Sequence, residues 1–129
     1  MENVVLDASA LLAMLFGERG GEGVEALLLE PEKSTTMSAL NWSEVFDRLL
    51  REGYGEEEVE GLLTPLAIEV IDFTRAQARM AAGLRIAAPA LSLADRACLG
   101  LATTTNASAW TADKMWTRVK TPARVHLVR

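Results

Sequence analysis

The sequence has little of several residue types, and each shortage excludes a class of protein. Its single cysteine, Cys98, excludes an internal disulfide and a cysteine-based zinc site. Its single histidine, His126, lies in an apolar stretch, which favours a structural role in a strand over catalysis. No apolar run reaches the roughly 18 residues that a membrane-spanning helix needs. The start of the chain is acidic and lacks a signal-peptide pattern, so we expect a cytoplasmic protein with no membrane partner.

The composition is that of one globular domain covering residues 1–129. Half of the residues are hydrophobic and 24% are charged, and the net charge is −5. The charge is unevenly distributed: residues 1–73 carry 16 acids and 4 bases, whereas residues 74–129 carry 2 acids and 9 bases. The second half therefore permits a basic surface for nucleic acid, for which we consider Arg75 and Arg79, with an ordinary solvated face as the alternative.

Apolar patterning predicts strands that alternate with helices. Short β-branched or alternating runs predict strands at 4–6, 34–37, 68–71, 107–111 and 125–128. Amphipathic or largely apolar stretches predict helices at 10–16, 24–30, 40–52, 56–66, 74–86, 92–103 and 114–119. This order predicts a three-layer α/β/α sandwich, in which about five mostly parallel strands have helices on both faces.

Four acidic residues lie where predicted strands end or the following helices begin: Asp7, Glu44, Asp95 and Asp113. Each has a structural explanation. Asp7 could cap the first helix, and Asp113 could be a turn or cap residue. Ser92 and Asp95 have the spacing of a capping box, Asn41 and Glu44 resemble it, and Glu44 could instead pair with Arg48. Asp95 fits its explanation least well, because its helical stripe is otherwise largely apolar and an unpaired buried charge is costly.

Taken together, the acids predict a metal site. The carboxyl ends of parallel strands and the helices that follow them lie at one edge of a sheet, where ligands bind. Four carboxylates in that crevice repel one another, and a hard cation such as Mg²⁺ or Mn²⁺ relieves the repulsion. Such a site can hold phosphate oxygens and activate water, so the predicted chemistry is phosphodiester hydrolysis without a histidine. Trp42, Trp110 and Trp116 are expected to be packing residues, with stacking on a base as the alternative for Trp116, near the last acid.

The four acidic segments resemble those of PIN-domain ribonucleases of the VapC toxin family. The segments are VVLDASALLAML, SALNWSEVFDRL, LSLADRACLGLA and WTADKMW, in the family's order. The resemblance implies a PIN-like fold whose catalytic acids are Asp7, Glu44, Asp95 and Asp113. It further implies that Asp7 and Asp95 bind Mg²⁺ or Mn²⁺ directly, with Ser9 and Thr111 as supporting hydroxyls. Members of this family cut RNA, are typically homodimers, and are inhibited by a cognate antitoxin protein whose tail occupies the groove.

Three other functions stay open. A PIN nuclease that acts in RNA processing or on DNA would carry the same acids. A phosphoacceptor receiver domain also has Asp at strand ends, but it needs paired acids after the first strand, and here Asp72 is the only candidate acceptor. A PIN fold kept only as a binding module has no reason to retain four mutually repelling carboxylates.

Overall fold

The computed structural model describes residues 2–129, which form one five-stranded sheet. The strands are β1 (Glu2–Leu6), β2 (Lys33–Ser38), β3 (Glu69–Ile71), β4 (Ser108–Thr111) and β5 (Arg124–Leu127). Their spatial order is β3-β2-β1-β4-β5, and all four pairings are parallel. The chain builds outward from β1 to β3 and then returns to place β4 on the other side of β1. This reversal beside β1 is the position where open α/β sheets bind ligands.

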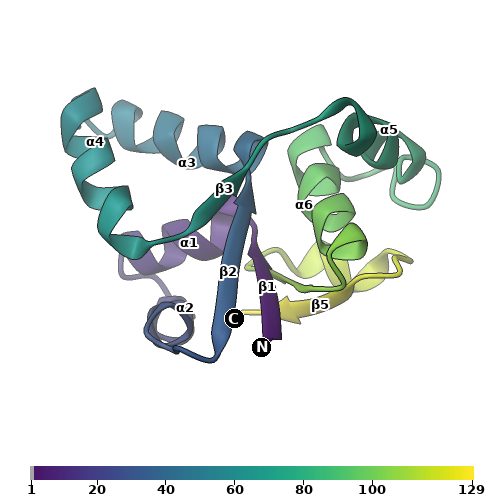
Figure 1. Ribbon diagram of the computed structural model, residues 1–129, viewed down its shortest axis with the longest axis horizontal. Coiled ribbons are helices and arrows are strands. Elements are labelled where there is room, and N and C mark those ends of the chain that lie inside the picture. The colour runs from purple at the N-terminus through teal and green to yellow at the C-terminus, as the bar shows by residue number, and fades with distance from the viewer. Residues whose placement is uncertain (1) are drawn as a thin grey trace.

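The helices cover both faces of the sheet, which confirms the predicted α/β/α sandwich (Figure 1). The α-helices of residues 2–129 are α1 (Ala8–Leu15), α2 (Gly21–Leu28), α3 (Ala39–Arg51), α4 (Glu56–Leu63), α5 (Arg75–Gly83) and α6 (Leu93–Thr104). Two 3-10 helices complete them, η1 (Thr64–Leu66) and η2 (Lys114–Arg118). In Figure 1, α1 to α4 lie on one side of the sheet, and α5 and α6 lie on the other.

The predicted helix over residues 56–66 is divided in two. Its α-helical part ends at Leu63, and a 3-10 turn that contains Pro65 follows. Proline cannot donate the backbone hydrogen bond that an α-helix needs at an interior position, so the α-helix ends before it. Among residues 2–129, no helix is both long enough and apolar enough to span a bilayer.

The central strand β1 contributes to two hydrophobic cores because successive side chains of a strand point to opposite faces. Val4 and Leu6 pack in the core beneath α1 to α4, whereas Val5 packs in the core that contains α6. Cys98 is completely buried in the second core, as expected for a small core residue. His126 stacks on Trp110 with ring centroids 4.1 Å apart, which agrees with a structural role. The start of α1 is thereby held at the middle of the sheet.

Candidate active site

Asp7 joins β1 to α1, and its side chain is free of helix capping. The backbone carbonyl accepts the first hydrogen bonds of α1, while the carboxylate makes no capping bond. Asp7 is only 4% exposed, and its carboxylate accepts three hydrogen bonds from neutral donors. Ser9 Oγ donates at 2.6 Å, Thr111 Oγ1 at 2.9 Å and Asn41 Nδ2 at 3.3 Å. The expected contacts of Asp7 with Ser9 and Thr111 are therefore present.

The same two hydroxyls attach the loop after β4 to Asp7. The register that pairs Leu6 with Trp110 brings the next residue, Thr111, beside Asp7. Thr111 Oγ1 accepts the backbone N–H of Asp113 at 3.0 Å, and Ser9 Oγ accepts that of Ala112 at 3.0 Å. The Asp113 side chain also begins η2, because its Oδ1 accepts the N–H of Met115 at 2.9 Å. Asp113 is exposed, and its backbone is held close to the first acid.

Asn41 is a central residue of the site. The sequence shows only that Asn41 and Glu44 resemble a capping box. The cap of α3 is instead Ser38, whose Oγ accepts the N–H of Leu40 at 3.3 Å. Asn41 is completely buried, and its Nδ2 lies 3.3 Å from Asp7 Oδ1, 3.3 Å from Glu44 Oε1 and 3.1 Å from the carbonyl oxygen of Ala94. Its Oδ1 has no hydrogen-bond partner within residues 2–129. One amide therefore connects β1, α3 and the first turn of α6.

The other two acids differ in how strongly the structure engages them. Glu44 accepts its hydrogen bond from Asn41, whereas the arginine one turn later, Arg48, pairs with Glu52 at 2.9 Å. The suggested pairing of Glu44 with Arg48 is therefore wrong. Asp95 does form the capping box that its spacing allows: Oδ2 accepts the N–H of Ser92 at 3.1 Å, and Ser92 Oγ accepts the N–H of Asp95 at 3.2 Å. Oδ1 of Asp95 takes no part in this box.

All four predicted acids line one open cavity of about 250 Å³. Its remaining lining residues are Ala8, Ser9, Leu12, Arg48 and Arg51. Within residues 2–129, no three acidic, histidine or cysteine side chains lie close enough together to enclose a metal ion by themselves. A cation in this cavity would therefore complete its coordination with water or substrate oxygens, as Mg²⁺ commonly does.

The electrostatics of the cavity favour a cation. Burial raises the pKa of Asp7, and the negative charge of Asp95 raises it further. The hydrogen bonds from Ser9 and Thr111 lower this pKa but do not cancel the rise. Burial likewise raises the pKa of Glu44, and the nearby charges of Asp7 and Asp95 raise it further. No salt bridge within residues 2–129 includes any of the four acids. Oxygen ligands whose charge is not neutralised by the protein suit a hard divalent cation.

Comparison with known proteins identifies the family to which the chain that forms this cavity belongs. The sequence pattern of the PIN domain matches residues 4–122, most of the chain and all four acids. The chain belongs to the PIN domain family. A search of curated protein sequences found no match to this PIN domain.

Solved structures with the same fold include VapBC from Salmonella typhimurium bound to DNA, at 14% identity and a TM-score of 0.74 over the whole of both chains. VapBC-1 from nontypeable Haemophilus influenzae is 13% identical, with a TM-score of 0.75 over 98% of each chain. VapC20 from Mycobacterium tuberculosis, a sarcin-ricin loop cleaving toxin, is 14% identical, with a TM-score of 0.71 over 89% of this chain and 93% of that one. At identities this low, the similarity to these structures establishes the fold of this chain and nothing beyond it.

Two other candidates from the sequence do not reach the cavity of the PIN domain. Trp116 is completely buried in the second core, which confirms that it is a packing residue and excludes the alternative that it stacks on a base. Asp72, the acceptor that a receiver domain would need, is exposed after the edge strand β3, away from β1.

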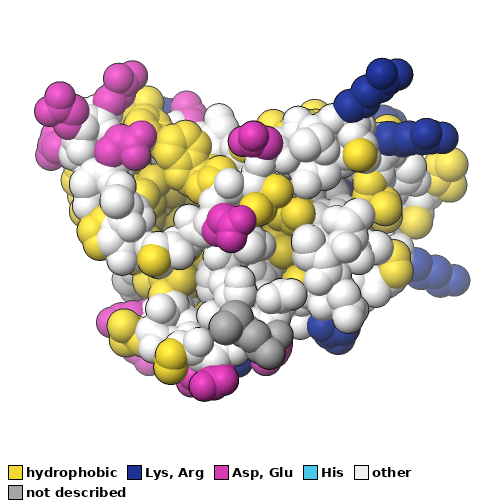
Figure 2. Space-filling view, in the orientation of Figure 1, with side chains coloured by type: hydrophobic (Ala, Val, Ile, Leu, Met, Phe, Trp, Pro, Cys, Tyr) yellow, Lys and Arg dark blue, Asp and Glu magenta, His cyan; other side chains and the backbone are white. Residues whose placement is uncertain are grey.

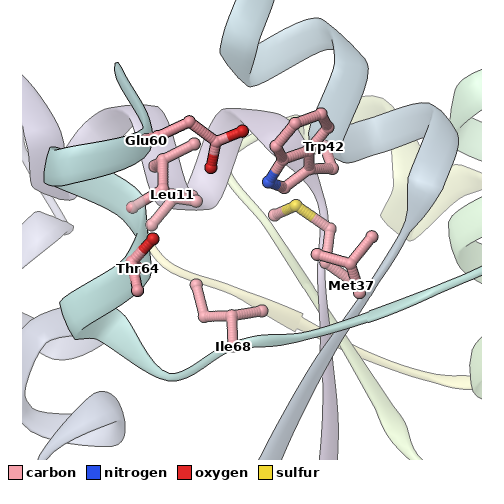
Figure 3. A pocket seen from close by; sticks show the side chains of 8 residues that line it. Leu11, Met37, Trp42, Glu60, Thr64 and Ile68 are labelled. Atoms are coloured by element: carbon pink, nitrogen blue, oxygen red, sulfur yellow. The ribbon is translucent and has the colours of Figure 1, made fainter. Parts of the chain in front are cut away.

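A second cavity, of about 350 Å³, is larger but chemically different (Figure 3). Leu11, Met37, Trp42 and Ile68 form much of its wall, and Glu60 is its only acid. Figure 3 shows these apolar side chains facing a common space between α4, α3 and the edge of the sheet. A single carboxylate in an apolar wall does not provide a metal site, so the acidic cavity is the candidate active site.

Proposed function

We propose that this PIN domain is a divalent-metal-dependent endoribonuclease that acts as the toxin of a toxin–antitoxin pair. The observation that carries the proposal is the convergence of four unpaired carboxylates on the cavity beside β1, two of them with raised pKa values. Structures of the same fold are described as a member of the VapBC family of toxin–antitoxin systems and as a sarcin-ricin loop cleaving toxin, which supports an antitoxin as partner and RNA as substrate. A homodimer is part of the same proposal.

In this proposal, Asp7 and Asp95 hold Mg²⁺ or Mn²⁺, and Glu44 and Asp113 complete the acidic wall of the cavity. When bound, the cation supplies positive charge to phosphate oxygens and a lowered pKa to a coordinated water. Ser9, Thr111 and Asn41 fix the orientation of the Asp7 carboxylate through the three hydrogen bonds described above. Glu44, whose pKa is raised, is suited to accept a proton on the oxygen that Asn41 does not bind.

Metal-dependent cleavage is tested by incubating antitoxin-free protein with a structured RNA pool in Mg²⁺, in Mn²⁺ or in EDTA. We expect cleavage only with metal, and a loss of about 100-fold or more in Asp7→Asn and Asp95→Asn, since even outer-shell changes cost about 10–100-fold. Asp72→Asn, which removes an exposed acid outside the cavity, is the matched control and should retain wild-type activity.

Equal cleavage in EDTA, or by either of the two cavity variants, would refute the mechanism. Single-stranded DNA of the same base sequence, incubated in parallel, tests the alternative nuclease: preferential cleavage of the DNA would replace the ribonuclease proposal with that one. Purification of the protein with its antitoxin should abolish cleavage, because the antitoxin is expected to occupy the groove.

A further inference from the structure

The acidic cavity also contains two arginines that belong to the acidic half of the chain. Residues 1–73 hold only four bases, and two of these, Arg48 and Arg51, line the cavity. None of the nine bases of residues 74–129 lines it. Both arginines follow Glu44 on α3, at intervals of four and three residues, which places the three side chains on one face of the helix. One wall of the cavity therefore changes from negative to positive along α3.

Local contacts orient both guanidinium groups but engage only the Nε donor of each. Arg48 lies with its guanidinium carbon 4.9 Å from the ring centroid of Phe16, and its Nε donates to Glu52 at 2.9 Å. Arg51 Nε donates to Asp47 at 3.0 Å. The side chains are 38% and 67% exposed, and within residues 2–129 their terminal nitrogens make no hydrogen bond. Exposed ion pairs of this kind are weak and exchange readily for a better acceptor.

A nucleic-acid strand that crosses this cavity needs such donors. The phosphate undergoing reaction would face the carboxylates and their cation, but its neighbour along the strand would face protein surface alone. An uncompensated phosphate beside four acids is repelled, whereas a guanidinium binds a phosphate through two parallel hydrogen bonds. The distribution of charge over the molecule makes the two arginines distinctive, because Figure 2 shows acidic side chains gathered over α4 and basic ones on the opposite side, near α5.

We propose that Arg48 and Arg51 form a binding site for the phosphodiester group adjacent to the one that is cleaved, and so fix the position of the strand across the acids. This proposal rests on the proposed nuclease function and adds to it the part of the chain that holds the substrate backbone. The two arginines position substrate and take no part in the chemical step. Their role differs from that of Arg75 and Arg79, which the sequence suggested for RNA and which lie on α5, outside the cavity.

The test compares two double variants with the same change in charge, Arg48→Gln/Arg51→Gln and Arg75→Gln/Arg79→Gln. Binding of a fluorescent single-stranded RNA is measured by anisotropy over a salt series, and cleavage of the same RNA is measured in Mg²⁺. Each lost phosphate contact lowers the magnitude of the salt slope by about 0.7. Because the two arginines share one phosphate, the Arg48/Arg51 variant should lose about 0.7 from the slope and about tenfold in KM, with kcat within about threefold of the wild type.

A second pair of substitutions separates substrate binding from loss of the ion pairs. Asp47→Asn/Glu52→Gln breaks the same two ion pairs but leaves both arginines free, so it should tighten RNA binding. If the Asp47/Glu52 variant weakens RNA binding as much as the Arg48/Arg51 variant does, or if the α5 variant loses as much slope, the proposed site is wrong. Mn²⁺ binding, followed by electron paramagnetic resonance, should not weaken in the Arg48/Arg51 variant, because this variant removes positive charge from the cavity.

The two proposals fail in different ways. A wild-type protein that cleaves RNA, together with an unchanged salt slope in the Arg48/Arg51 variant, would overturn the phosphate site and leave the nuclease intact. A wild-type protein that neither binds nor cleaves RNA would overturn both.

Discussion

Asp7→Asn should stabilise the metal-free protein while it abolishes activity. The Asp7 carboxylate is buried with a raised pKa, so at neutral pH the folded state holds a charge that burial disfavours. Asparagine has nearly the same shape, and its amide fits the same neighbours. Its Oδ1 can accept from Asn41, and its Nδ2 can donate to the hydroxyl oxygens of Ser9 and Thr111. The substitution therefore removes the charge and retains the three contacts, with the direction of the two hydroxyl hydrogen bonds reversed.

The size of this effect follows from the burial of Asp7. Incompletely compensated desolvation of a polar group costs about 1–3 kcal/mol in proteins. An entropy of unfolding of about 2.1 cal/mol/K per residue converts 1 kcal/mol into about 4 °C for a chain of this length. In EDTA, the melting temperature of Asp7→Asn should therefore exceed that of the wild type by about 4–12 °C. Metal at 100 times its dissociation constant should add about 2.7 kcal/mol to the wild type alone, which would close or reverse the difference.

Thermal unfolding monitored by circular dichroism, with EDTA and with a series of Mn²⁺ concentrations, measures both effects. Asp72→Asn serves as the control, because it removes an exposed charge and should change the melting temperature little under either condition. A variant less stable than the wild type in EDTA would refute the argument that Asp7 carries a buried, uncompensated charge. Equal stabilisation of Asp7→Asn and the wild type by Mn²⁺ would refute Asp7 as a ligand.

Two further predictions concern pH and Asn41. Because the folded-state pKa values of Asp7 and Glu44 are raised, the folded protein binds more protons than the unfolded chain between the unfolded values, near 4, and the folded ones. In EDTA, the stability advantage of Asp7→Asn over the wild type should therefore shrink as the pH falls below neutral; an advantage that grows in acid would contradict the sign. Asn41→Ala should lower Mn²⁺ affinity by about 10–100-fold and destabilise the protein by about 1–3 kcal/mol, since it removes the buried donor that Asp7, Glu44 and Ala94 share. Calorimetric titration with Mn²⁺ and thermal unfolding measure these losses, and wild-type affinity in this variant would exclude a positioning role for Asn41.

The fold and the acidic cavity could be predicted because they depend on local order along the chain. Alternation of strands and helices specifies a parallel sheet, and residues at strand ends then share one edge whatever the strand order. Asp7 and Asp113 follow from this rule alone. The rule does not specify how far each helix is rotated, so it could not show that Arg48 lines the cavity and pairs with Glu52 instead of with Glu44.

Residues whose role depends on contacts between distant segments were missed. Asn41 acts through oxygens on β1 and α6, and nothing in its neighbourhood in the sequence distinguishes it from a capping residue. For Trp116 the sequence left base stacking open beside packing, and only the fold of η2 into the second core decides between them. Sequence could not settle either residue, because periodicity describes one element at a time, whereas burial depends on what packs against it.

The bonds around Asp7 also have a consequence for kinetics. Its partners Asn41 and Thr111 lie 34 and 104 residues away in sequence, and Asn41 reaches a further 53 residues to Ala94. The carboxylates can therefore adopt their arrangement only after both ends of the chain and its middle have docked, late in folding. A cation that recognises this arrangement has little affinity for the earlier transition state, so it slows unfolding while it leaves the rate of folding nearly unchanged. In the cell, metal would thus prolong the lifetime of the folded enzyme without hastening its formation.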